Sequence, residues 1–99
     1  MKILILGAGR VGSSLASTLS RQNYEVSIVD LNKDKLLRLQ EDYDLATELG
    51  HSSHPNTLER AGADQDTILL AVTNSDECNI ASCQIAKSKF NVKKTICRL

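Results

Sequence analysis

Apolar and polar residues follow two patterns that alternate regularly along the chain. Short, mostly apolar runs predict buried β-strands, and longer segments with apolar residues at helical spacing predict the helices between them. The runs that predict strands cover 2–6, 25–30, 45–49, 67–72 and 94–98. The segments that predict helices cover 10–21, 33–43, 55–61 and 76–90.

Strict alternation of strand and helix is typical of an α/β fold. It predicts a Rossmann-like, doubly wound parallel sheet of about five strands, with helices on both faces and right-handed crossovers. A doubly wound dinucleotide domain usually continues through another helix and a sixth strand. Because the chain stops at Leu99, where the fifth strand ends, we expect 1–99 to be one domain, truncated at its C-terminus, from a longer chain.

Two of the expected helices carry apolar patterns that predict their packing. The helix over 76–90 is apolar on two sides, which indicates contact with a neighbouring subunit or with a further part of the chain as well as with the sheet. One side holds Ile80, Cys83, Ala86 and Phe90, and the other holds Cys78, Ala81 and Ile85. In 10–21 the buried stripe is expected to contain Val11, Leu15, Ala16 and Leu19.

Composition and charge narrow the function classes. Twelve basic and twelve acidic side chains cancel, so nothing points to nucleic acid or to an anionic membrane surface. With two Tyr, one Phe and no Trp, the chain has no stacking platform for single strands. No signal-peptide pattern follows Met1, and no apolar run approaches the roughly 20 residues that span a bilayer. The three cysteines form no CxxC pair, so we expect buried, reduced thiols and a cytoplasmic domain.

The stretch ILGAGRVG at 5–12 places three glycines as G-x-G-x-x-G between a predicted strand and a predicted helix. Gly7 permits the tight turn, Gly9 lets backbone N–H groups approach a pyrophosphate, and Gly12 lets the helix pack closely on the sheet. The start of the helix then directs its free N–H groups at the phosphates. Glycine spacing alone, however, is equally compatible with a structural turn.

Asp30, at the end of the next predicted strand, favours the nucleotide interpretation. Its carboxylate can accept hydrogen bonds from the adenosine ribose hydroxyls and would repel a 2′-phosphate, which favours NAD over NADP. Lys33 and Lys35 lie close by in the sequence and weaken that preference. The glycine loop together with Asp30 predicts an NAD-binding loop rather than a turn with an incidental acid.

Two further strand ends supply candidate contacts. The first and fourth strands of a doubly wound sheet are neighbours, so Thr73 and Asn74 should lie beside Gly7 and could bond a ribose or a phosphate. They could alternatively cap the following helix, although Ser75 is available for that. Arg98, at the end of the fifth strand, could meet a phosphate.

Three other residues, in the glycine loop and after the third predicted strand, each allow more than one role. Arg10, inside the loop, could offset phosphate charge, lie over the adenine, or be a solvated residue at a helix start. His51 and His54 form HxxH, but a metal needs three or four ligands and no cysteine is expected nearby. They are predicted to be polar loop residues near the ligand edge, and no metal site is expected.

Longer stretches of the sequence resemble the regulatory N-terminal domains of TrkA-type potassium-uptake proteins, in the RCK/KTN family. The resemblance covers essentially the whole chain. It rests on MKILILGAGRVGSSLA at the start, IVD at 28–30, GHSSHPNTLERAGA at 50–63, LLAVTNSDECNIASCQIAK at 69–87 and the ending ICRL.

The resemblance implies a non-catalytic cytoplasmic subunit that binds NAD+ or NADH; some relatives in the wider group bind ATP or ADP at the same site. It implies a homo-oligomeric ring on the cytoplasmic face of the inner membrane, beneath a potassium-translocating subunit that the nucleotide regulates. With the glycine motif, it predicts a site of Gly7, Ala8, Gly9, Arg10, Val11, Gly12, Asp30, Thr73, Asn74 and Arg98.

The alternative function is the cofactor-binding half of an NAD-dependent dehydrogenase. Hydride transfer needs an acid or base beside the nicotinamide, whereas His51 and His54 follow the third strand, on the adenosine side. The sequence therefore favours a sensor, although a catalytic part beyond Leu99 stays open. A purely structural interaction domain does not account for Asp30 together with the glycine loop.

Overall fold

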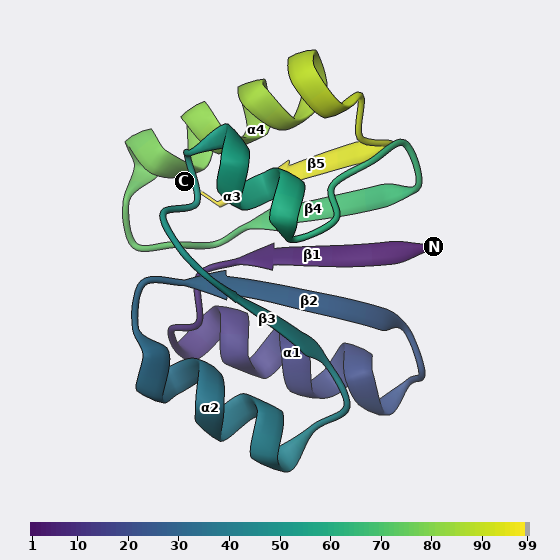
Figure 1. Ribbon diagram of the computed structural model, residues 1–99, viewed down its shortest axis with the longest axis vertical. Coiled ribbons are helices and arrows are strands. Elements are labelled where there is room, and N and C mark those ends of the chain that lie inside the picture. Colours follow the sequence, from purple (N-terminus) through teal and green to yellow (C-terminus); the bar gives the residue numbers. More distant parts are fainter. Residues whose placement is uncertain (99) are drawn as a thin grey trace.

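A computed structural model describes residues 1–98, which form a parallel five-stranded sheet between two layers of helices (Figure 1). Every expected strand and helix is present, with boundaries within one residue of those expected; Leu99, the end of the expected domain, lies outside the described residues. The strands are β1 Lys2–Leu6, β2 Glu25–Asp30, β3 Ala46–Leu49, β4 Thr67–Ala71 and β5 Lys94–Cys97. The helices are α1 Arg10–Arg21, α2 Lys33–Asp42, α3 Pro55–Arg60 and α4 Asp76–Phe90.

The strand order is β3-β2-β1-β4-β5, and every neighbouring pair is parallel. Helices α1 and α2 pack on one face of the sheet, and α3 and α4 pack on the other (Figure 1). The chain winds outward from β1 to β3 and then crosses back to β4, so its direction reverses at β1. The predicted Rossmann-like, doubly wound fold is therefore confirmed. Ligands of such sheets bind at this reversal, outside the carboxyl ends of the strands.

Strand β1 contributes side chains to two hydrophobic cores, one on each face of the sheet. From Ile3 to Leu6 its residues are at most 6% exposed, and alternate residues point to opposite faces of the sheet. This explains why the strand reads as one continuous apolar run rather than as an alternating pattern. One core contains Ile3, Ile5, Val26, Ile28, Ala16, Leu36 and Leu39, and the other contains Leu4, Leu6, Val29, Leu58, Leu69, Ala71 and Ala86.

The expected buried stripe of α1 is wrong at its first position. Val11 is 38% exposed, whereas Gly12 and Ala16 are the buried residues of the helix. Leu15 and Leu19 are half-buried and pack against the core, as expected. The helix approaches the sheet most closely at Gly12, which has no side chain, and this places Val11 outward.

The structure also shows which apolar residues of α4 pack against the core and which are exposed. Residues Cys83, Ile85 and Phe90 pack against the core, but Ile80 is 44% exposed. The innermost positions of the helix include two polar residues, which the apolar pattern did not identify. These are Asn79 and Ser82, both fully buried.

Within residues 1–98, no helix combines the length and the apolarity needed to cross a bilayer.

Gly12 fixes the distance between α1 and the turn that precedes it. A Cβ atom added at Gly12 would lie 1.7 Å from the Gly7 carbonyl oxygen and 2.8 Å from the Gly7 carbonyl carbon. Both are backbone atoms, so no side-chain movement could relieve the overlap. The role predicted for Gly12, close packing of the helix on the sheet, is confirmed.

The substitution Gly12→Ala should therefore cost about 3 kcal/mol or more of unfolding free energy, because α1 must shift away from β1. Gly9→Ala is a matched control: a Cβ there would meet no heavy atom within 4 Å, and the backbone is extended. We expect Gly9→Ala to change stability by less than about 1 kcal/mol. Urea unfolding of both variants measures the difference; equal losses would contradict the assignment.

Candidate functional site

A cleft of about 380 Å³ opens at the carboxyl ends of β1, β2, β4 and β5. Eight of the ten predicted site residues line it, together with Lys35 and Val72, which were not predicted. The eight are Gly7, Gly9, Arg10, Val11, Asp30, Thr73, Asn74 and Arg98. The other two residues do not line this cleft. Ala8 lines a separate pocket between the glycine loop and α2, and Gly12 packs against Gly7.

The first two glycines of the loop have separate roles in this cleft. Gly7 has φ +108°, a conformation that favours glycine, and an added Cβ would lie 3.0 Å from the Thr73 backbone. Gly9 is the N-cap of α1 and has no side chain that could satisfy the free N–H groups of the first turn. No protein atom within 4 Å requires a glycine there, and the space beside it opens on the cleft.

Asp30 ties the glycine loop to the start of α2. Its Oδ1 accepts a hydrogen bond from the Ala8 N–H, and its Oδ2 accepts one from the Asn32 N–H, both at 2.8 Å. Each carboxylate oxygen keeps capacity for a further donor. Asp30 is therefore positioned by the backbone and can still accept hydrogen bonds from a ligand.

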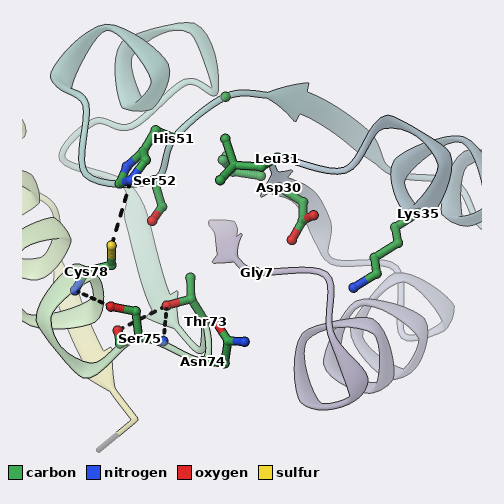
Figure 2. A pocket seen from close by; sticks show the side chains of 12 residues that line it. Gly7, Asp30, Leu31, Lys35, His51, Ser52, Thr73, Asn74, Ser75 and Cys78 are labelled. Carbon is green, nitrogen blue, oxygen red and sulfur yellow. Dashed lines mark hydrogen bonds between the residues drawn. The ribbon is translucent and has the colours of Figure 1, made fainter.

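Thr73 stands opposite Asp30 across the cleft, and its hydrogen bonds are largely used within the protein (Figure 2). The hydroxyl donates to Asn79 Oδ1 at 2.6 Å, its shorter contact, with the Ser75 carbonyl as a second acceptor at 3.2 Å, and it accepts from the Ser75 N–H at 3.2 Å. Ser75 caps α4 by accepting from the Cys78 N–H, so Thr73 and Asn74 are not needed as caps. With its proton donated to Asn79, Thr73 Oγ1 can only accept a hydrogen bond from a ligand.

Asn79 was missed by the sequence analysis, although it belongs to the quoted stretch at 69–87. Its Oδ1 accepts from the Thr73 N–H at 3.0 Å, and its Nδ2 donates to the carbonyls of Thr73 and Arg98, both at 3.1 Å. The side chain is fully buried, and all its hydrogen-bonding capacity is used. Its helical spacing to Cys83, Ala86 and Phe90, which were predicted to lie on one apolar side of the helix, is the signal that could have identified it.

A second cleft of about 300 Å³ adjoins the first and shares Gly7, Asp30, Lys35, Thr73 and Asn74 with it (Figure 2). Its outer wall is the loop after β3 and the first turn of α4. The residues that complete it are Val29, Leu31, Gly50, His51, Ser52, Ser75 and Cys78. His51 thus lies at the edge of the site, as expected.

The expectation that no cysteine lies near the HxxH loop is wrong. Cys78 Sγ lies 3.9 Å from His51 Nε2, because α4 begins beside the loop after β3 (Figure 2). His51 Nδ1 accepts from the Ser53 N–H at 3.2 Å, and its ring stacks on His54 with centroids 4.6 Å apart. Among the described residues, no group of three or more metal-ligating side chains forms a site.

The charges around the two clefts favour an anionic ligand. Arg10, Lys35 and Arg98 line the first cleft, and Asp30 is its one acidic residue. The ion pairs of residues 1–98 lie elsewhere and involve none of these three cations. The free N–H groups at the start of α1 add a positive potential on the same side.

The cysteines are free, as expected, but they are half-buried rather than fully buried. Burial, together with the neighbouring Cys97 thiol, raises the pKa of the Cys83 thiol to about 11. A thiol with such a pKa is protonated and unreactive at neutral pH.

Comparisons with known proteins show the family and the fold of the chain. The chain is 50% identical over 99 residues to the Trk system potassium uptake protein TrkA of Vibrio alginolyticus, and spans 22% of that relative's length. Its fold is similar to that of the Shewanella denitrificans Kef CTD in AMP-bound form, with TM-score 0.78 and 23% identity over 95% of this chain and 57% of that one.

It is also similar to the GsuK channel bound to NAD, with TM-score 0.74 and 22% identity over 94% of this chain and 17% of that one. At these identities the two solved structures show the shared fold. The family model of the TrkA-N domain matches residues 3–99. The chain therefore belongs to the TrkA-N domain family.

Proposed function

We propose that residues 1–99 are a nucleotide-binding domain, part of a longer chain, that binds NAD+ or NADH and regulates potassium uptake without catalysing a reaction. One observation carries the binding proposal. Residues from four strand ends converge on a single cleft, around a glycine at position 9 that no protein contact requires. A ligand that comes close to the backbone supplies the missing reason for that glycine.

The cleft fits the parts of a dinucleotide. The pyrophosphate lies over Gly9 and the start of α1, where N–H groups and the Arg10 side chain offset its charge. The adenosine ribose donates its hydroxyls to Asp30. The other half extends towards Thr73, Asn74 and Arg98. Because Thr73 Oγ1 can only accept, it suits a ribose hydroxyl, whereas Asn74 and Arg98 can donate to phosphate.

NAD(H) is the first choice of ligand, and ATP or ADP are alternatives at the same site. Asp30 at the ribose position disfavours a 2′-phosphate. The neighbouring structures support both classes, because the Kef CTD is bound to AMP and the GsuK channel to NAD. The adenosine half of the site is common to all these ligands.

Regulation rather than chemistry is supported by what lines the far half of the cleft. On the β4–β5 side the described lining residues are Val72, Thr73, Asn74 and Arg98. Neither an amide nor a guanidinium acts as a general acid or base at neutral pH. The groups suited to proton transfer, His51 and Cys78, line the adjoining cleft and not this one.

The partner in this proposal is a membrane potassium-translocating subunit, since the relatives are named as Trk system potassium uptake proteins. The domain acts as a homo-oligomer on the cytoplasmic face of the inner membrane. Nucleotide can shift such an assembly only if it binds one conformation better than another. The cleft must therefore bind the nucleotide more tightly in one conformation of the assembly than in the other.

Gly9→Ala tests the binding proposal directly, because it leaves the fold intact and places a methyl group in the phosphate cradle. We expect NADH affinity to fall at least about tenfold, the loss of one charge-assisted backbone contact. Isothermal titration calorimetry of the variant and the unchanged chain gives both affinities. Equal affinities in a folded variant would reject this position for the phosphates.

Asp30→Asn tests the ribose contact while keeping a side chain of the same shape. We expect NADH to bind about tenfold more weakly and the preference for NADH over NADPH to shrink, because the negative charge is removed. Glu41→Gln is the control, because it also removes a carboxylate charge but lies on the exposed side of α2 and lines neither cleft, so it should leave the preference unchanged. An unaltered NADH to NADPH ratio in Asp30→Asn would refute the role of the carboxylate.

A sensor and a dehydrogenase differ in what they do with NADH. In the full-length protein assembled with its translocator, Gly9→Ala should abolish the response of potassium flux to added NADH, with no NADH consumed in either protein. Flux into vesicles and absorbance at the NADH band measure the two quantities. Steady oxidation of NADH by the unchanged protein with a small carbonyl compound would overturn the regulatory assignment.

A further inference from the structure

Asn79 connects the two strand ends that form one side of the cleft. It accepts from the Thr73 N–H and hydroxyl at 3.0 and 2.6 Å, and donates to the Thr73 and Arg98 carbonyls at 3.1 Å. The Thr73 N–H and carbonyl thus bond to one side-chain amide, in place of the backbone partner that a neighbouring strand supplies. Asn79 therefore continues the pairing of β4 beyond the point where β4 and β5 are hydrogen-bonded as strands.

The position of Arg98 depends on the same amide. The Arg98 N–H donates to the Ala71 carbonyl at 3.0 Å, and the Arg98 carbonyl accepts from Asn79. Both backbone groups of Arg98 are therefore held, one by β4 and one by Asn79. The arginine side chain is exposed and lines the cleft, so its starting point is fixed although its guanidinium is free to move.

We propose that Asn79 is a positioning residue of the nucleotide site, which fixes the Thr73 hydroxyl and the Arg98 side chain relative to each other. It does not touch the ligand. It sets the proton of Thr73 towards the protein interior, so that Thr73 Oγ1 presents an acceptor, and it holds the end of β5 so that Arg98 reaches the same ligand. The proposal rests on the nucleotide-binding function proposed above.

An alternative reading gives Asn79 a purely structural role, as one more buried polar residue of α4. Ser82 distinguishes the two. It lies on the same buried face, three residues on, is fully buried, and donates from Oγ to the Ser52 carbonyl at 3.0 Å. Ser82 has no hydrogen bond to Thr73 or Arg98, so Ser82→Ala disturbs the burial of α4 without touching the proposed connection.

The test is a double-mutant cycle with NADH affinity measured by calorimetry, below the melting temperature of each variant. Arg98→Ala alone should weaken binding about tenfold, the loss of one charge-assisted contact. In the Asn79→Ser chain, the added cost of Arg98→Ala should fall below about threefold, because Arg98 is already displaced. In the Ser82→Ala chain it should stay at about tenfold. A cost of about tenfold in all three backgrounds would overturn the proposal.

A second variant keeps the cycle interpretable if Asn79→Ser does not fold. Asn79→Asp has the same shape and keeps the acceptor for Thr73, but lacks the two donors to the carbonyls. In the Asn79→Asp chain, too, the added cost of Arg98→Ala in NADH affinity should fall below about threefold. An Arg98→Ala cost that stays at about tenfold in Asn79→Asp would count against the proposal as it would in Asn79→Ser.

Amide hydrogen exchange in the absence of ligand separates this proposal from the nucleotide function. In Asn79→Ser, exchange at Thr73 and at Arg98 should be faster than in Ser82→Ala by at least about tenfold, because the two strand ends are released. In Asn79→Asp, which keeps the acceptor for the Thr73 N–H, the faster exchange is expected at Arg98. Equal exchange would refute the positioning role even if NADH binds. If the unchanged chain binds no nucleotide, the proposed function fails, while the exchange rates still decide whether Asn79 fixes the two strand ends.

Discussion

The close contact between the start of α1 and the turn after β1 is the constraint on which the site depends. Because Gly12 has no Cβ, the helix can lie against the Gly7 carbonyl, and its first turn ends at the edge of the sheet. That placement directs free N–H groups into the space between the ends of β1 and β4. Any larger residue at Gly12 would move both the helix and the ligand-facing backbone.

The polar groups around the cleft are organised before any ligand arrives. Asp30 is held by the Ala8 and Asn32 N–H groups, and Thr73 is held by Asn79. Groups fixed in this way lose little conformational entropy on binding, so more of their interaction energy remains as affinity. The cations differ, because Arg10 and Arg98 are exposed and take part in no ion pair within residues 1–98.

Much of the fold was predictable because each local signal agreed with the others. The glycines end β1, Asn32 caps α2, and Pro55 begins α3, so the turns and helix starts confirm the strand pattern. Most of the site followed from the rule that parallel strands end at one edge of the sheet. The predictions failed where two segments distant in sequence meet. The contact of His51 with Cys78 is one such case, and the burial of Asn79 is another.

The sequence by itself determined the order of elements, the parallel sheet, the glycine loop and the acid that follows it, because periodicity and turn chemistry are local properties. It also determined membership of the TrkA-N family through stretches spread over nearly the whole chain. Only the tertiary structure decided which apolar residues are buried and whether the Thr73 hydroxyl can donate a hydrogen bond to a ligand or only accept one. Those properties depend on what packs opposite each side chain. Val11 faces outward because Gly12 makes the contact with the Gly7 carbonyl. Thr73 Oγ1 is left as an acceptor because its hydroxyl donates its hydrogen bond to Asn79, six residues on.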